Sequence, residues 1–188
     1  MSEIEDKYVF LTPRICIETL VNKRVFYQSL IKNKVSHPTT YFPDNYNEVK
    51  EIGQKIEYSV IIKPAITQLF APRFWSKVLV VRSQEELENY WKLALQYKVV
   101  IQEIIPGPPT NVFAITGYFN RNNNPNGSFA YQRKRDWPLG FGCNSLIESI
   151  PMGALQMCKE TTTRYLKEIG YTDLFEAEFK RDSRDGSF

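Results

Sequence analysis

Residues 99–107 read VVIQEIIPG and separate an upstream half of the chain from a downstream half with a different pattern. Its β-branched residues favour a strand, which Pro106-Gly107 then ends. The polar pair Gln102-Glu103 interrupts the apolar run just before this stop. Such a strand can serve as a hinge between two lobes, because its backbone carbonyl and amide groups can meet an adenine edge, which needs one acceptor and one donor. An ordinary edge strand would show the same pattern.

Upstream of this stretch the sequence predicts a small α+β lobe. Capping boxes formed by Asn45 with Glu48 and by Ser83 with Glu86 mark two helix starts. The segment over 65–76 is predicted to be a loop. The other predicted elements are a helix over 20–31, an extended piece over 39–42, a helix over 45–55, strands over 58–63 (YSVIIK) and 77–82 (KVLVVR), and a helix over 83–95.

Downstream, the polar turn RNNNPNG at 121–127 lies between alternating segments and predicts a hairpin. Gly170 follows a helical pattern and is a good C-terminal stop. An Asp185-Gly186 turn after the last strand invites a return strand, so we expect the sequence to be truncated before it. The predicted elements are strands over 111–120 and 128–135, an irregular aromatic stretch over 136–142, a short run near 145–150, a helix over 153–169 and a strand over 174–181.

The composition is that of a globular protein without a strong demand for nucleic acid. The 188 residues are 43% hydrophobic and 24% charged, and the formal net charge of +3 is mild. Three widely spaced cysteines without a secretory signal favour reduced thiols and a cytoplasmic protein. A single histidine argues against a zinc site and a Ser-His-Asp triad. No apolar run approaches the ~20 residues of a membrane span.

Three lysines stand where they could meet an anion. Lys63 ends one predicted strand and Lys77 starts the next, so both could aim an ammonium group into the intervening space, where phosphates accept charge-assisted hydrogen bonds. Lys23 lies on the first predicted helix. Lysines also commonly flank strands as solubilising ends, so the pattern alone leaves both interpretations open.

The last predicted strand carries two carboxylates on one face. Alternation places the apolar residues of FEAEFK (175–180) on one side and Glu176, Glu178 and Lys180 on the other. Such carboxylates could hold Mg²⁺, which prefers few carboxylates together with phosphate oxygens. A solvated strand face is the alternative interpretation.

Arg133 and Arg135 lie two residues apart on the strand predicted over 128–135 and therefore share a face. Paired guanidinium groups suit bidentate recognition of phosphate or carboxylate. A basic strand face exposed to solvent would look the same. Together with Arg121 and Lys134, these arginines could instead contact nucleic acid, which would then bind with a steep salt dependence.

Five segments follow one another in an order that carries more information than any one of them. They are Asn22-Lys23, Ile61-Ile62-Lys63-Pro64, Lys77–Val81, Gln102–Gly107 and Glu178–Asp182. In this order they resemble the ATP-grasp superfamily, in the branch of the ATP-binding domains of carbamoyl-phosphate synthetase and amino-acid ligases. The resemblance extends from about Lys23 to Phe188. It implies an α+β fold of two lobes, with mainly antiparallel sheets and the nucleotide cleft between them.

The resemblance also implies an organisation along the chain. Residues 1–18 would be a linker from a missing N-terminal domain, 19–105 the small lobe with the hinge, and 106–188 the large lobe. The family expects a further strand after the last residue, with a glutamate and an asparagine that complete the metal site. The large lobe would then be incomplete, and the fragment would be inactive alone.

Roles follow from the resemblance position by position. Lys23 and Lys63 would contact the phosphates of ATP, and Lys77 would lie beside the mobile loop that closes over the nucleotide. Adenine would be bound mainly through backbone groups of the hinge residues Gln102, Glu103, Ile104 and Ile105.

The remaining roles concern the metal and the acyl substrate. Glu178 would be the first magnesium ligand. Arg133 and Arg135 would contact the acyl substrate or the transferred phosphate, Arg135 as a catalytic residue. The segment 65–76 departs from the family because it lacks glycine, so its aromatic residues would close the pocket differently or serve another ligand.

The chemistry implied by the resemblance is ligation through an acylphosphate. A small carboxylate attacks the γ-phosphate of ATP, and an amine, or a thiol, then displaces phosphate, with Mg²⁺ neutralising the developing charge. The implied partners are ATP, Mg²⁺, the carboxylate and the amine, and neither a membrane nor nucleic acid is expected. A non-catalytic nucleotide-binding or regulatory module is the alternative.

Overall fold

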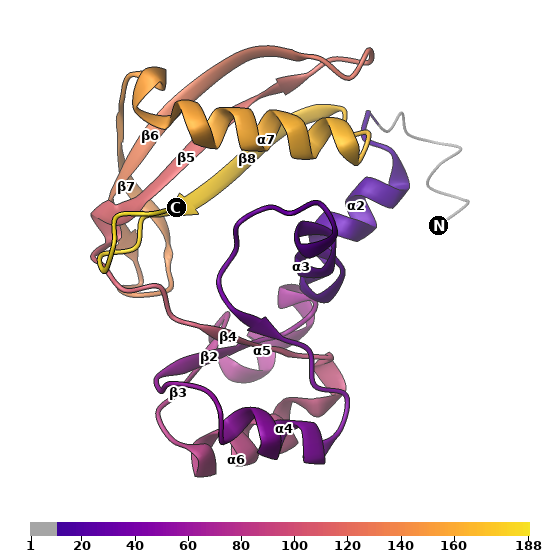
Figure 1. Cartoon of the computed structure of the whole chain (residues 1–188), viewed down its shortest axis with the longest axis vertical. Helices are drawn as coiled ribbons and strands as arrows, with labels where there is room; N and C mark the ends of the chain where they lie inside the picture. Colours follow the sequence, from indigo (N-terminus) through magenta and orange to yellow (C-terminus); the bar gives the residue numbers. More distant parts are fainter. Residues whose placement is uncertain (1–10) are drawn as a thin grey trace. The chain divides into compact units, whose positions relative to one another are not determined.

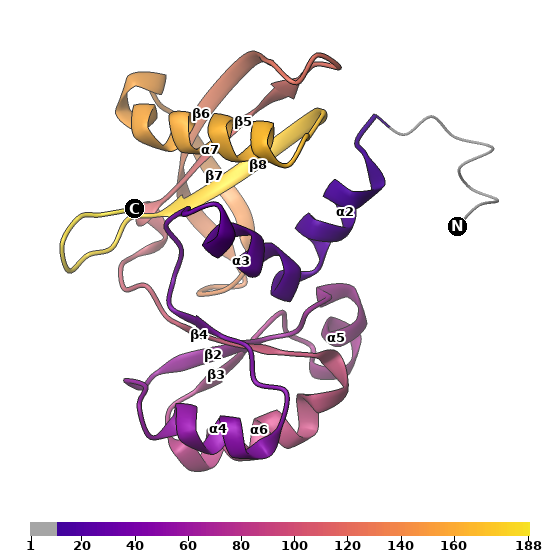
Figure 2. The same ribbon diagram turned by 45° about the vertical axis from the view of Figure 1, so that its right-hand side comes forward.

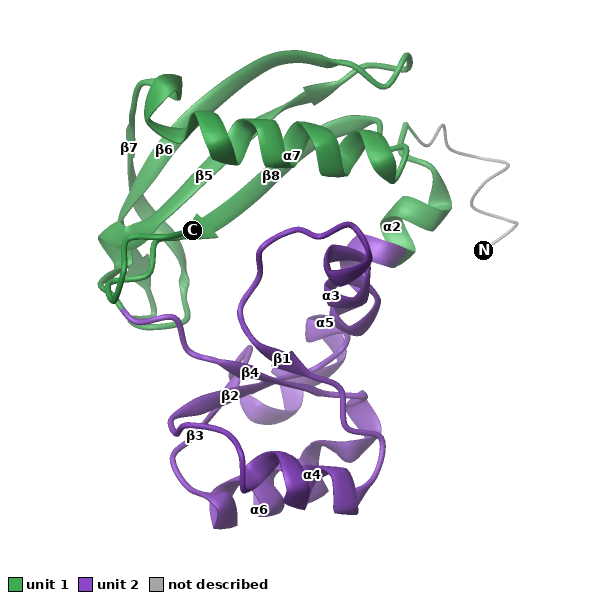
Figure 3. Ribbon diagram, in the orientation of Figure 1, with its two compact units in different colours: residues 1–18, 107–188 green, residues 19–106 purple. Residues whose placement is uncertain are grey.

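The computed structural model describes residues 11–188 and divides into two compact units. Unit 2 comprises Thr19–Pro106, and unit 1 comprises Gly107–Phe188 together with the described residues up to Glu18 (Figure 3). Each unit contains helices and its own four-stranded sheet, and the strand pairs in both sheets are antiparallel. The expected α+β architecture with two antiparallel sheets is therefore confirmed.

Unit 2 contains a sheet in the strand order β1-β4-β2-β3. Helix α2 (Arg14–Val21), which the sequence did not predict, crosses the boundary between the units. The helix predicted over 20–31 is confirmed as α3, whose start is capped by Asn22. The other elements are α3 (Lys23–Lys32), β1 (Thr40–Tyr41), α4 (Tyr46–Gly53), β2 (Val60–Lys63), α5 (Thr67–Phe74), β3 (Leu79–Val81), α6 (Gln84–Ala94), the 3₁₀ helix η1 (Leu95–Tyr97) and β4 (Val100–Glu103).

The two faces of this sheet differ in character. Helices α4 and α6 cover one face (Figure 1), where the side chains form an apolar core. Because side chains alternate along a strand, Lys63 and Gln102 lie on the opposite face, where Tyr27 of α3 reaches Gln102. The fully or almost fully buried core residues include Val49, Val60, Ile62, Phe70, Val81, Leu87, Trp91, Ala94, Val99 and Ile101.

Both predicted capping boxes are confirmed. Asn45 Oδ1 accepts a hydrogen bond from the backbone N–H of Glu48 at 3.0 Å at the start of α4. Ser83 Oγ accepts one from Glu86 at 3.2 Å at the start of α6. Each glutamate carboxylate in turn accepts from the backbone N–H one residue before the cap, at 2.9 and 2.7 Å, so these helix starts are fixed by local hydrogen bonds.

The prediction of a loop over 65–76, between β2 and β3, is wrong, because Thr67–Phe74 forms α5. Pro72 lies inside this helix and lacks a backbone donor, so local propensity does not favour the helix. Tertiary packing favours the helix instead. Phe70 is fully buried, stacks on Phe74 with ring centroids 4.1 Å apart, and meets Tyr97 edge-on with centroids 5.2 Å apart. These aromatic contacts anchor α5 to the core of unit 2.

Unit 1 contains a sheet in the order β7-β6-β5-β8, with α7 lying across one face (Figure 2). The predicted hairpin and the predicted C-terminal helix are confirmed, and Gly170 ends that helix with a φ of +70°. Within residues 11–188, no helix has the length and hydropathy needed to cross a bilayer. The elements are η2 (Pro109–Asn111), β5 (Val112–Phe119), β6 (Pro125–Trp137), β7 (Cys143–Ser149), η3 (Met152–Leu155), α7 (Gln156–Glu168) and β8 (Asp173–Lys180).

The predicted alternation on β8 is confirmed. Phe175 and Phe179 pack against the core cluster that η3 and α7 cover, whereas Glu176 and Glu178 are exposed. The strand register places both Glu178 of β8 and Tyr131 of β6 beside Ala114 of β5. The face that does not pack against α7 therefore carries the carboxylates.

Candidate functional site

Unit 2 gathers the three lysines that the sequence predicts as nucleotide contacts. Lys23 begins α3, and its ammonium group donates a hydrogen bond to Thr67 Oγ1 at 2.6 Å, at the start of α5. Burial lowers the pKa of Lys23, and the charges of Lys63 and Lys77 lower it further. The positive charges of Lys63 and Lys77 thus disfavour the charge of Lys23, and a bound anion would offset this repulsion.

Lys63, at the end of β2, is held by a polar network on the same face of the sheet. Its ammonium group donates to Gln102 Oε1 at 2.6 Å and contacts Tyr27 Oη at 3.5 Å. Gln102 is only 1% exposed, and its Nε2 donates to Thr40 Oγ1 at 2.7 Å. The side chain of Gln102 therefore supports Lys63, a role that the sequence did not predict.

The segment predicted as an adenine hinge lies at the end of β4. Since β4 lies between β1 and β2, it is not an edge strand, and the backbone of Gln102 is paired on both sides. The backbone N–H of Glu103 donates to Thr39 O at 3.0 Å, and its carboxylate accepts from Thr39 N at 2.7 Å. Ile104 and Ile105 follow the strand and are half-buried. Adenine binding by this segment stays a prediction.

In unit 1 the predicted metal ligand is joined to one of the predicted arginines. Glu178 Oε1 accepts a hydrogen bond from Arg133 Nη2 at 2.5 Å. Asn144 of β7 links the group, because its Oδ1 accepts from Arg133 Nε and its Nδ2 donates to Tyr131 Oη at 2.9 Å. Burial raises the pKa of Tyr131, and the nearby carboxylates Glu176 and Glu178 raise it further, so this hydroxyl stays protonated.

Arg135 is separated from this group. A register shift between Arg133 and Arg135 interrupts the pairing of β6 with β7, and the exposed Arg135 donates to Ser145 Oγ at 3.3 Å. Lys134 forms an ion pair with Glu148 at 2.5 Å. Two of the four cations considered for nucleic-acid contact are therefore paired with carboxylates of their own unit, which weakens that alternative.

The sequence assigned no role to two further charged residues near this group, Lys180 and Asp136. Lys180 is half-buried, and its pKa is lowered by burial and by Arg133, while Asp136 and Asp182 act in the opposite direction. Asp136 is 1% exposed, and its Oδ2 accepts from the backbone N–H of Gly140 at 3.1 Å. The alternation on β8 predicts that Lys180 shares the face of Glu178, whereas the buried position of Asp136 depends on the β6–β7 turn.

The carboxylate of Glu178 in unit 1 could bind Mg²⁺ only together with ligands from outside the described residues, such as phosphate oxygens and water. Among residues 11–188, no group of three or more His, Cys, Asp or Glu side chains could hold a metal ion. Mg²⁺ is usually bound through one or two carboxylates together with substrate phosphates and water. Glu178 therefore fits a metal ion that arrives with a nucleotide better than one held by protein alone.

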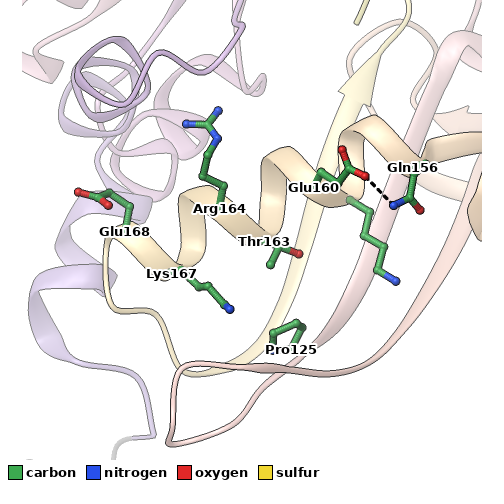
Figure 4. A pocket seen from close by; sticks show the side chains of 8 residues that line it. Pro125, Gln156, Glu160, Thr163, Arg164, Lys167 and Glu168 are labelled. Atoms are coloured by element: carbon green, nitrogen blue, oxygen red, sulfur yellow. Dashed lines mark hydrogen bonds between the residues drawn. The ribbon is translucent and has the colours of Figure 1, made fainter.

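A groove of about 620 Å³ lies elsewhere on unit 1, along α7 (Figure 4). Its lining includes Lys159, Thr163 and Lys167, and Gln156 donates to Glu160 within it at 2.7 Å. None of the site residues predicted from the sequence lines this groove, so it is not part of the candidate site.

Solved structures of three enzymes are similar to this chain. The first is N5-carboxyaminoimidazole synthase from Aspergillus clavatus in complex with ADP and 5-aminoimidazole ribonucleotide, at 11% identity and a TM-score of 0.70, covering 98% of this chain and 47% of that one. The second is the biotin carboxylase domain of 2-oxoglutarate carboxylase from Hydrogenobacter thermophilus with MgADP and bicarbonate, at 17% identity and a TM-score of 0.67, covering 97% and 42%. The third is L-amino acid ligase from Bacillus licheniformis, at 17% identity and a TM-score of 0.64, covering 93% and 40%.

These similarities show a shared fold. The chain spans less than half the length of each of the three solved chains. No family model and no curated protein matches the sequence.

Proposed function

We propose, from the ATP-grasp fold that this chain has, that it is the ATP- and magnesium-binding domain of an ATP-dependent ligase. The ligase would join a small carboxylate to an amine or a thiol. Thr19–Pro106 would act as the small lobe with the hinge, and Gly107–Phe188 as the large lobe. The similar enzymes support this assignment, since one was solved with ADP, one with MgADP and bicarbonate, and one is an amino-acid ligase.

The observation that carries the proposal is the lysine group of unit 2. Lys23, Lys63 and Lys77 come from three separate segments, yet Lys63 and Lys77 both lower the pKa of Lys23. An anion with several negative charges would offset this repulsion if it bound between the lysines. A triphosphate has the charge and the length to contact more than one ammonium group.

Glu178 and Arg133 would serve the metal and the transferred group. Mg²⁺ bound at Glu178 with the phosphates would neutralise charge that develops on the leaving group. Binding of a cation at Glu178 competes with the ion pair to Arg133, so the guanidinium group would become available to a phosphate or carboxylate oxygen. Arg135 would add a second, more exposed guanidinium group.

The chemistry follows from positioning and electrostatics. Lys23 and Lys63 would fix the phosphates so that the substrate carboxylate meets the γ-phosphorus in line with its leaving group. The carboxylate oxygen forms a bond to phosphorus as the bond to the β-phosphate oxygen breaks, giving an acylphosphate and ADP. The amine or thiol then attacks the acyl carbon and releases phosphate.

The lowered pKa of Lys23 predicts a pH dependence of nucleotide affinity. Below its lowered pKa, Lys23 is charged and attracts phosphate; as the pH rises through that value, the charge is lost before the ordinary lysine value of 10.5 is reached. We therefore expect the affinity for ATP to fall as the pH rises through the range below the ordinary lysine pKa of 10.5. Calorimetric titrations with ATP across this range measure the effect.

The variant Lys23→Met should remove the early part of this fall and weaken binding at neutral pH. Lys32→Met, at the exposed C-terminal end of the same helix, is the matched control and should keep the pH profile of the wild type. Identical profiles for the wild type and Lys23→Met would contradict the role given to Lys23.

A second prediction concerns the metal. Glu178→Gln removes the charge that would hold Mg²⁺, so the ratio of ATP affinities with and without Mg²⁺ should drop by about tenfold. Titrations of ATP in the presence of Mg²⁺ and of a chelator give this ratio. Glu148→Gln is the control, because it breaks another ion pair of unit 1 of the same length, 2.5 Å. An unchanged ratio in Glu178→Gln would exclude it as a metal ligand.

An assay of ADP release in Glu178→Gln distinguishes a ligase from a non-catalytic nucleotide-binding module. In a protein that turns over, Glu178→Gln should abolish carboxylate-dependent ADP release while ATP is still bound. A non-catalytic nucleotide-binding module would show nucleotide binding in the wild type and no carboxylate-dependent ADP release in any variant.

A further inference from the structure

The turn of the β5–β6 hairpin (Figure 1) contains five asparagines, and hydrogen bonds hold the side chains of three of them. The side-chain oxygen of Asn120 accepts from the backbone N–H groups of Asn122 and Asn124, at 2.9 and 3.2 Å. Asn124 Nδ2 donates to Asn122 O at 3.2 Å. Asn123 Nδ2 donates to Lys167 O, at the end of α7, at 2.9 Å. These bonds restrain the three amides.

Asn126 differs from these three in its surroundings and in the residue that follows it. It is exposed, and within residues 11–188 no group forms a hydrogen bond with its side-chain amide. The next residue is Gly127, which is the one glycine of the sequence that follows an asparagine. The carboxamide carbon of Asn126 can therefore approach the backbone nitrogen of Gly127 without first breaking a side-chain hydrogen bond.

The backbone at this place is also outside the regular strand pairing. In the register of β5 against β6, two residues of β6, Asn126 and Gly127, lie opposite the single residue Tyr118, which is a β-bulge. Gly127 has a φ of +82°, a value that glycine adopts at no steric cost. A Cβ added to Gly127 would meet no atom within 4 Å, so this side of the backbone is open. The bulge thus leaves room for the two residues to react with each other.

We propose that Asn126 is a modification site, which loses its side-chain amide as ammonia through a succinimide formed with Gly127. The backbone nitrogen of Gly127 gives up its proton and bonds to Cγ of Asn126, while the Cγ–Nδ2 bond breaks and the released nitrogen takes up the proton and leaves as ammonia. Water then opens the five-membered ring at either carbonyl carbon and leaves an aspartyl or an isoaspartyl residue at position 126. Glycine favours the ring closure because it has no Cβ beside the attacking nitrogen.

The reaction changes the charge of one surface of unit 1. It adds a carboxylate to the turn and lowers the formal net charge of +3 by one. Pro125, the residue before Asn126, lines the groove along α7 together with Lys159 and Lys167 (Figure 4). Within residues 11–188, neither lysine forms an ion pair. The new carboxylate therefore arises beside a groove whose two ammonium groups have no carboxylate partner.

The experiment is incubation of the folded full chain at mildly alkaline pH, followed by tryptic digestion and tandem mass spectrometry. Cleavage after Arg121 and Arg133 yields one peptide that contains four of the five asparagines. We expect the exchange of NH₂ for OH, seen as a gain in mass, to be about tenfold faster at Asn126 than at the other asparagines of this peptide. Asn124 is the internal control, because Pro125 lacks the N–H that ring closure requires.

A synthetic peptide with the sequence of residues 122–133 gives the rate in the absence of the fold. We expect the folded chain to react at a rate within about tenfold of the peptide, because neither a side-chain hydrogen bond nor regular strand pairing restrains Asn126. Gly127→Ala places a Cβ beside the attacking nitrogen and should slow the reaction by about tenfold. Should the positive φ prevent this variant from folding, Asn126→Gln serves instead, since it keeps an amide but its ring would be six-membered, and it should stay unmodified.

The outcomes either support or overturn the modification site. A gain in mass at Asn126 of the folded wild type, with an isoaspartyl product and with no gain in Asn126→Gln, supports it. If Asn126 stays intact in the folded chain while the synthetic peptide reacts, the fold protects the residue and the inference is overturned. Equal rates at all asparagines of the tryptic peptide would overturn it as well. The reaction needs neither ATP nor Mg²⁺, so this inference and the proposed function fail independently of each other.

Discussion

Replacing Lys63 by methionine is expected to weaken the binding of Mg·ATP by about 100-fold or more, since a charge-assisted hydrogen bond to phosphate is among the strongest polar contacts in a protein. Methionine has a similar length and fills the same space without the charge. The change removes the ammonium group that the buried Gln102 holds at 2.6 Å. It also lessens the repulsion on Lys23, so the loss of affinity cannot be attributed to a less favourable charge there.

Calorimetric titration with Mg·ATP measures this effect, and a melting curve checks that the variant is folded. Lys55→Met is the matched control, because Lys55 is exposed and lies just after α4, whose helix packs on the other face of the sheet. It should bind Mg·ATP as the wild type does. Equal affinities for the wild type and a folded Lys63→Met variant would show that Lys63 does not contact the nucleotide.

The variant Phe70→Ala is expected to lower the free energy of unfolding of unit 2 by about 3–5 kcal/mol, the range for a fully buried phenylalanine. Phe70 is 0% exposed and contacts Phe74 and Tyr97, so its removal leaves a cavity that α5 cannot fill. Because Pro72 already weakens the helix, α5 should lose its structure first.

Urea unfolding followed by the fluorescence of Trp91, which is buried in unit 2, measures this change. Variants should be compared in a background in which Trp75 and Trp137, both exposed, are replaced by phenylalanine. Leu69→Ala is the control on the same helix, because Leu69 is 65% exposed and should cost less than about 1 kcal/mol. Equal losses in the two variants would contradict the packing role of Phe70.

Much of the fold could be predicted because its signals are local. The capping boxes at Asn45 and Ser83 place α4 and α6 within one or two residues, and the period of two on β8 assigns Glu178 to the correct face. The polar turn at 121–127 similarly identifies the β5–β6 hairpin. Each signal depends on residues that are neighbours in the chain, so no tertiary information is needed.

The features that could not be predicted depend on contacts between distant residues. Helix α5 is held by the burial of Phe70, which a run containing Pro72 does not reveal. Asn144 reaches Arg133 because of the register of β6 against β7, and that register includes a shift that a single strand does not encode. The side-chain role of Gln102 requires the pairing of β4 with β2.

For the candidate site too, features that depend on neighbouring residues could be read from the sequence, whereas side-chain pairs that depend on distant contacts could not. The strand-end positions of Lys63 and Lys77 and the order of the segments suggested that these lysines act together with Lys23, and the charges of Lys63 and Lys77 lower the pKa of Lys23; their contact with a nucleotide stays a prediction. Arg133 and Arg135 were considered as a pair, but the structure joins Arg133 to Glu178 and leaves Arg135 with Ser145. Adenine recognition at 102–105 and metal binding at Glu178 stay predictions.

The central claim is that this chain binds the triphosphate of ATP through the lysines of unit 2. Isothermal titration calorimetry of the folded 188-residue chain with ATP in excess Mg²⁺ tests it most directly. We expect a saturable heat for a single site, which is lost in Lys63→Met and retained in Lys55→Met. No binding heat and no ATP-dependent rise in melting temperature, with the protein shown to be folded, would contradict it.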